Sequence, residues 1–321
     1  MDFNLTDVQR SWRERGHALG RELSAESSAA DVVLGAASAG LLDSSADLLA
    51  AVVAVEALAY ESAPAGVAFG LHTAVLTALG ADDRFTALAR GEVVGAIALS
   101  TEKIPTESGG RLSGRASLVG PLTNRGIAIV GARSGEGIVA GAVSLDASGV
   151  TVEMVETSAL RGFVCGNLAI DDAPAILVGA TVPFMARARI LLAAAGLGMG
   201  RRALNEALHA AHALRGHGAG GEQTVQGLLA DAATELDAAM LLTWKAASAT
   251  HVSLAESSMA KLAATDATLR AVARATQVIG VDSFRRGHVV ESLAQDVRAL
   301  ELFAGRTEAL REAVAGETLP R

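Results

Sequence analysis

The sequence predicts an α+β fold in which a helical N-terminal domain, a β-rich middle domain and a C-terminal antiparallel helical bundle follow one another. Runs rich in Ala, Leu and Val with helical length fill the first 90 residues. Short apolar runs broken by Gly, Asn and Asp follow, and long helical runs then return. We place the domains at residues 1–91, 92–182 and 183–321.

Composition limits the function. Half of the 321 residues are hydrophobic, which is enough for a large core. A net charge of −8 and 3% aromatic residues argue against a nucleic-acid partner. The single cysteine, Cys165, excludes a disulfide framework and a zinc site with several cysteines, and we expect it to be a small buried residue. Without a signal peptide or a membrane-spanning apolar run, we expect a soluble, cytoplasmic protein with no membrane partner.

The N-terminal helices begin with a recognisable cap. Thr6-Asp7-Val8-Gln9 fits a capping box, in which the side chains of Thr6 and Gln9 each bond the other residue's backbone. Residues 46–60, "ADLLAAVVAVEALAY", have the length and composition of a second helix. The segment "GADDRFTALARGE" closes this domain.

The middle segment reads as strands. Its runs include "VVGAIALST", "GIAIVGAR", "GIVAGAVSL" and "GVTVEMVE", with turn residues between them and no long helical pattern. This spacing predicts an antiparallel sheet or a small barrel rather than alternating β/α units. The stretch "SGGRLSG" contains a turn between two strands.

The C-terminal segment reads as long helices. They cover residues 185–217, 222–252 and 256–280, and two shorter runs finish the chain. The Gly-rich segment 216–221 separates the first two helices, and Gly280 ends the third.

Three chemical motifs were weighed and rejected. Gly196, Gly198 and Gly200 suggest a dinucleotide-binding turn, but the third glycine of that motif is Arg201, so close helix contact explains them better. Glu206, His209 and His212 share a helix face, but no second Glu-x-x-His completes a di-iron site, so a solvated face is the better reading. The sequence contains no Gly-x-Ser-x-Gly motif, the turn that usually carries the nucleophile in Ser/His/Asp catalysis.

Several stretches, in chain order, carry a family resemblance. They are "MDFNLTDVQR", "LSTEKI", "RGFVCGNLAIDDAPA", "AAAGLGMGRRALNEALHAA", "EQTVQGLLADAATELDAA", "SSMAKLAATDATLRAVARATQVIG" and "VESLAQDVRALELFAGRTEALR". The last resembles a motif "Val-Glu-Arg…Arg-Asp-x-Arg…Ile-Tyr-Glu-Gly-Thr…Arg". Together they resemble the acyl-CoA dehydrogenase family over nearly the whole chain.

The resemblance implies that the catalytic base is missing. Family members remove the α-proton of an acyl-CoA with a Glu while the β-hydride passes to the flavin N5, and a carboxylate aimed in a desolvated pocket suits that weak acid. In most members the Glu lies in the "Tyr-Glu-Gly-Thr" stretch, which matches Ala304 here. Others carry it at a position that matches Ala188. Alanine cannot accept a proton.

The flavin site implied by the resemblance is eroded on one side. The ring-holding "Trp-Ile-Thr" stretch is Leu118-Val119-Gly120 here, and Thr101 stands at the other ring-contacting position. The adenosine diphosphate end is held by a neighbouring subunit, where this chain keeps Arg215, Gln223 or Gln226, Gln277 and Gly280. A Phe-Gly after Arg215 is missing and the second glycine is Val281. Arg215 could pair with a pyrophosphate or be an ordinary helix C-terminal charge, with Gln277 a polar cap.

We therefore expect one subunit of an α2β2 acyl-CoA dehydrogenase, resembling the base-lacking subunits of actinobacterial steroid-CoA dehydrogenases. It would share FAD with a catalytic paralogue and act on an acyl-CoA, a steroid side-chain CoA of cholesterol catabolism being one candidate. An alternative is an inactive homo-oligomeric acyl-CoA-binding protein of the same fold. A third reading is a complete enzyme with an unconventional base such as Glu102 or Asp231.

Overall fold

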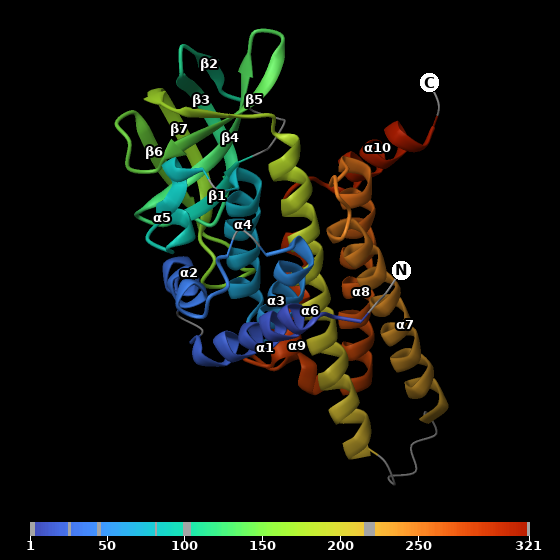
Figure 1. The fold of residues 1–321 in the computed structure, drawn as a ribbon. Helices are drawn as coiled ribbons and strands as arrows, with labels where there is room; N and C mark the ends of the chain where they lie inside the picture. The colour runs from blue at the N-terminus through green and yellow to red at the C-terminus, as the bar shows by residue number, and fades with distance from the viewer. Residues whose placement is uncertain are drawn as a thin grey trace.

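The computed structural model describes residues 4–24, 27–43, 46–80, 82–98, 104–214 and 222–319. Helices at the two ends of the chain pack together as one body, and the sheet extends from one side of it (Figure 1). The predicted helix, sheet, helix order is confirmed, whereas the exact domain boundaries stay a prediction.

The N-terminal region is helical as expected. Thr6 and Gln9 form the predicted capping box at the start of the first helix. A second capping box, between Ser28 and Asp31, opens the next helix. The elements are α1 (Asp7–Glu22), α2 (Ala29–Ser38), α3 (Leu48–Glu61), α4 (Ala63–Leu79), η1 (Asp83–Phe85) and α5 (Thr86–Ala89).

The middle region is an eight-stranded sheet with the order β6-β7-β3-β2-β4-β5-β8, and β1 pairs with β4 beside that path. Most pairs are antiparallel as predicted, but β1 and β2 each pair parallel with β4, which the prediction did not include. The strands are β1 (Val94–Ala98), β2 (Thr106–Ser108), β3 (Arg111–Val119), β4 (Gly126–Ser134), β5 (Gly137–Ser144), β6 (Val150–Val155), β7 (Cys165–Pro174) and β8 (Ile176–Gly179). The "SGGRLSG" turn joins β2 to β3 as predicted.

The C-terminal region consists of three long helices and two short ones. Gly280, with a φ of 73°, caps the third long helix as predicted, because glycine adopts this left-handed conformation without strain. The elements are α6 (Val182–Leu214), α7 (Glu222–Ala247), α8 (Leu254–Ile279), η2 (Gly280–Phe284), α9 (Val289–Leu300) and α10 (Thr307–Thr318).

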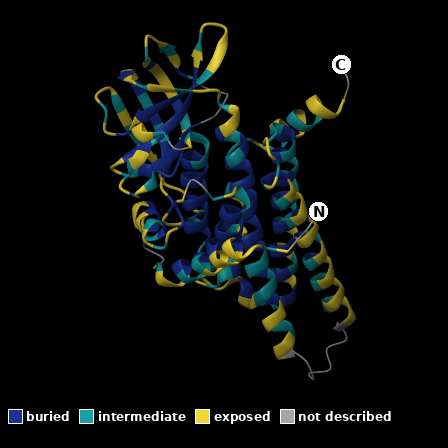
Figure 2. Cartoon of the chain, viewed as in Figure 1, coloured by how far each residue is buried: buried dark blue, intermediate teal, exposed yellow. Residues whose placement is uncertain are grey.

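One core connects the two helical ends of the chain. The buried side chains form a continuous column through α3, α4, α6 and α8 (Figure 2). The only described helix that is long and apolar enough to cross a membrane lies in this column, Val182–Ala213, and 78% of its apolar window is buried. Its burial places this helix in the core of the helical bundle.

The three glycines on α6 confirm the close-contact interpretation. A Cβ on Gly198 would lie 2.2 Å from the backbone oxygen of Glu56 on α3, and one on Gly200 would lie 2.5 Å from Leu236 on α7. These glycines let the helices approach each other, so no dinucleotide turn exists here.

Candidate functional site

The site centres on the turn between α9 and α10. This turn, residues 301–305, carries Ala304 at the position that the resemblance assigns to the catalytic Glu. Ala304 has a φ of 54°, a left-handed conformation that is uncommon outside glycine, and Gly305 follows it with a φ of 116°. The one carboxylate in the turn, Glu301, pairs with Arg298 at 3.1 Å.

Two buried cations hold this turn in place. Arg189 on α6 donates from Nε to the carbonyl oxygen of Ala304 at 2.9 Å and from Nη1 to Ser258 Oγ at 2.8 Å. Lys261 on α8 donates from Nζ to the carbonyl oxygen of Gly305 at 2.9 Å. These bonds fix two consecutive carbonyl groups of the strained turn from two different helices.

Neither cation has a carboxylate among its hydrogen-bond partners in the described residues. Arg189 is 5% exposed and Lys261 is 1% exposed. Burial, followed by the positive charge of Arg189, lowers the pKa of Lys261 to about 7, although Glu301 acts in the opposite direction. Burial lowers the pKa of Arg189 to about 10. The turn is therefore held by two buried basic side chains, and neither of them is hydrogen-bonded to a carboxylate among the described residues.

The second position at which the family can carry its base, Ala188, also lacks a carboxylate. Ala188 is fully buried next to Arg189. Asp231, one of the two unconventional candidates, is exposed on α7 and lies 3.7 Å from Arg274 in an ion pair. It lies on a different element from the turn and from Arg189. The other candidate, Glu102, lies outside the described residues, as does Thr101.

The flavin-ring position does not fit a ring-holding site. A Cβ on Gly120 would lie 2.6 Å from the Phe163 ring, so a threonine there would collide with it. Phe163 is buried and meets Phe303, the neighbour of Ala304, edge to face with ring centroids 5.4 Å apart. Leu118 is 38% exposed with a φ of 55° and offers neither an indole nor a hydroxyl. Phe163 and Phe303 fill this region with packed aromatic rings.

The positions expected to serve a neighbouring subunit are on the surface. Gln277 and Gly280 are exposed at the end of α8, and nothing lies within 4 Å of a Cβ built on Gly280. Val281 is 81% exposed and Phe284 is 72% exposed, which places an apolar pair on the same turn. The two alternative glutamines, Gln223 and Gln226, are exposed on the first turns of α7. Arg215 lies outside the described residues.

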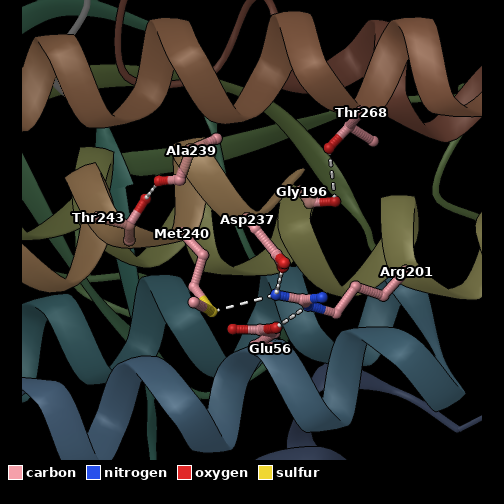
Figure 3. A network of polar contacts seen from close by, with 8 residues as sticks. All are labelled: Glu56, Gly196, Arg201, Asp237, Ala239, Met240, Thr243 and Thr268. Atoms are coloured by element: carbon pink, nitrogen blue, oxygen red, sulfur yellow. Dashed lines mark hydrogen bonds and ion pairs between the residues drawn. The ribbon is translucent and has the colours of Figure 1, made fainter. Parts of the chain in front are cut away.

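The sequence analysis did not predict a polar network around Arg201, where α3, α6 and α7 meet. Arg201 donates from Nε to Glu56 at 2.6 Å, and from Nη2 to Asp237 at 3.1 Å and to the sulfur of Met240 (Figure 3). The clue in the sequence was Arg201 in place of a glycine. Arg201 therefore connects α3, α6 and α7.

The remaining polar candidates form no metal site. Glu206 accepts from Arg202 at 3.0 Å, and His209 and His212 are exposed. Within the part of the chain that the structure describes, no group of three or more His, Cys, Asp and Glu side chains could hold a metal ion. Cys165 is buried, and burial raises the pKa of its thiol.

Comparisons with known proteins find similarity to acyl-CoA dehydrogenases over part of the chain. Residues 179–319 match the family model "Acyl-CoA dehydrogenase, C-terminal domain". The short-chain specific acyl-CoA dehydrogenase of Homo sapiens is 30% identical over 200 residues, which are 57% of this chain and 48% of that protein. The chain thus matches about half the length, or less, of the curated relatives.

Solved structures share the whole fold. Butyryl-CoA dehydrogenase from Megasphaera elsdenii has a TM-score of 0.85 at 19% identity, with all of both chains covered. A glutaryl-CoA dehydrogenase from Mycobacterium smegmatis in complex with FADH2 has a TM-score of 0.82 at 16% identity and covers 99% of this chain and 95% of its own. At these identities the likeness establishes the fold alone.

Proposed function

We propose that this chain, whose fold and C-terminal domain are those of acyl-CoA dehydrogenases, is the base-lacking subunit of an FAD-dependent acyl-CoA dehydrogenase. The observation that carries the proposal is the 301–305 turn. Two buried cations hold it in shape, yet the position that would carry the base is Ala304 and the second position is Ala188. The turn is thus held by hydrogen bonds from Arg189 and Lys261, but neither base position carries a carboxylate.

The second argument concerns the cofactor. FAD accepts a hydride in this chemistry when it is bound. Phe163 lies where a side chain at position 120 would be, and Leu118 offers neither an indole nor a hydroxyl, so we infer that this subunit lacks the ring-holding half of the site. Gln277 and Gly280, which the resemblance assigns to the neighbour's adenosine diphosphate group, are exposed and available. The chain would therefore help to hold FAD in its partner rather than in itself.

The partner would be a catalytic acyl-CoA dehydrogenase paralogue in an α2β2 assembly. Val281 and Phe284 support a protein contact on the same turn, because such exposed apolar side chains are typical of interfaces. We propose an acyl-CoA thioester as substrate, with a steroid side-chain CoA as one candidate, and the cytoplasm as location. The single runner-up is a homo-oligomeric acyl-CoA-binding protein, since the same apolar turn could equally contact a second copy.

Bound flavin tests the proposal. The chain is purified alone and with a Glu-bearing paralogue, and visible absorbance is compared per chain. We expect a colourless lone chain and stoichiometric flavin in the complex. A yellow lone chain that an acyl-CoA reduces would contradict the proposal, and a colourless homo-oligomer that binds acyl-CoA would establish the runner-up.

The variant Ala304→Glu adds a second test. A carboxylate at 304 would stand on the residue whose carbonyl oxygen accepts from Arg189, and a nearby guanidinium favours the charged form of a carboxylate. We nevertheless expect no turnover by the lone variant, because the flavin-ring position remains filled. Appreciable acyl-CoA oxidation by the lone variant would refute the assignment of the ring position.

A further inference from the structure

A separate polar cavity lies away from the 301–305 turn. It has a volume of about 380 Å³ and lies where the end of α1, the junction of α3 and α4, the segment between β6 and β7, and α9 meet. This volume is in the range of small-molecule sites. Ser24, Ser158, Arg161 and Gly287 are exposed lining residues, so the cavity opens to the surface.

A buried carboxylate lies in its wall. Asp296 on α9 is 7% exposed, and its Oδ1 accepts the backbone N–H of Leu160. Among the described residues, Asp296 makes no ion pair and accepts no other hydrogen bond. A buried charge of this kind is normally paired, because desolvation of an unpaired carboxylate is costly.

The two nearest lining side chains of α9 cannot neutralise Asp296, because both are uncharged. Ser292 precedes it by one helical turn, and Gln295 donates to Glu291 at 2.7 Å. In the motif that this helix resembles, arginines occupy both of these positions. Asp296 therefore has no cationic hydrogen-bond partner at either of these two neighbouring positions of α9.

The charged groups around the cavity are few. Arg202 is held by Glu206 at 3.0 Å and lies over the ring of Tyr60. Glu61 already accepts from His17 and Arg21. Arg161, exposed at the mouth, is near enough to lower the pKa of Asp296, and Glu291 raises it; burial outweighs both and brings this pKa to about 6.

We propose that this cavity is a binding site for a small organic cation, a ligand with a guanidinium or ammonium group that pairs with Asp296. The carboxylate supplies the charge, and the volume accommodates the rest of the ligand. Ser292 and Ser158 add hydroxyl groups to the wall. None of residues 301–305, Arg189 and Lys261 lines this cavity, so this proposal stands or falls separately from the proposed function.

Calorimetric titration of the full chain with methylguanidine, and with methylurea as a neutral probe of the same shape, tests it. We expect methylguanidine to bind at least about tenfold more tightly than methylurea, as charge pairing requires. Near pH 6 we also expect proton release on binding, detected as a dependence of the heat on the ionisation enthalpy of the buffer. Equal binding of the two probes would overturn the proposal.

Variants locate the binding. Asp296→Asn keeps an oxygen that can accept from Leu160 and removes the charge, so it should lose the preference for methylguanidine and the proton release. Asp282→Asn, at an exposed site, is the matched control. Ser292→Arg places a guanidinium one turn from Asp296 and should block the probe, whereas Ser292→Met adds bulk without charge. Binding that survives both Asp296→Asn and Ser292→Arg would overturn the assignment.

Discussion

Replacing Lys261 by Met would change how stability depends on pH. The ammonium is 1% exposed, and its pKa is about 7 in the folded chain against an ordinary value of 10.5. Between these two values the unfolded chain binds one proton more than the folded chain. The free energy of unfolding should therefore rise with pH in this window and fall as pH drops toward 7.

The magnitude follows from the shift. Each pH unit of full proton difference contributes about 1.4 kcal/mol, and the slope is about half of that at the folded pKa. Wild-type stability should thus gain about 2 kcal/mol between pH 7 and 9 from this group, and Lys261→Met should lack this gain. The methionine also gives up the bond to the Gly305 carbonyl, worth about 1 kcal/mol at every pH.

Urea unfolding at pH 7, 8 and 9 measures the difference. Lys245→Met is the matched control, because that ammonium is 53% exposed and pairs with Glu256 at 3.1 Å. The control should keep the wild-type dependence on pH. If Lys261→Met keeps it too, the burial argument for Lys261 is wrong.

Two further predictions concern close packing. Gly198→Ala should destabilise the chain by about 3 kcal/mol, because its Cβ would meet the Glu56 backbone oxygen at 2.2 Å. The control Gly227→Ala lies in open space on α7 and should instead stabilise the chain by about 0.5–1 kcal/mol. If the denaturant midpoints of the two variants shifted in the same direction, the packing argument would be wrong. Gly120→Thr should cost about 1–3 kcal/mol through collision with Phe163, and in the Phe163→Ala background the same change should cost much less; additive costs in a double-mutant cycle would show that the two residues do not meet.

The sequence predicted what local patterns control. The capping box at Thr6, the long helices and the Gly280 stop depend on neighbours a few residues away, and all are confirmed. The parallel pairing of β1 with β4 was missed, because strand direction is set by contacts far apart in the sequence. The three-domain boundaries stay a prediction.

The candidate site was less predictable. Ala304 and Ala188 were identified only by matching the sequence to family motifs, because an alanine has no chemical property that marks it as a former base position. The resemblance did not reveal that Arg189 and Lys261, on two different helices, donate hydrogen bonds to carbonyl oxygens of the 301–305 turn. The three segments lie far apart in the sequence. The same reason hid the contact of Phe163 with Phe303, which joins the β-region to the C-terminal turn.

The shared core has a consequence for how this protein would respond to any binding partner. Because α6 packs against α3 and α4 from the first part of the chain and against α7 and α8 from the last, the helices cannot melt separately without exposing the same buried column. The helical ends should behave as one cooperative unit in calorimetry. A molecule bound at Asp296, or a subunit docked on Val281, would then stabilise the whole helical unit. Calorimetry would show this as a rise in its single melting temperature.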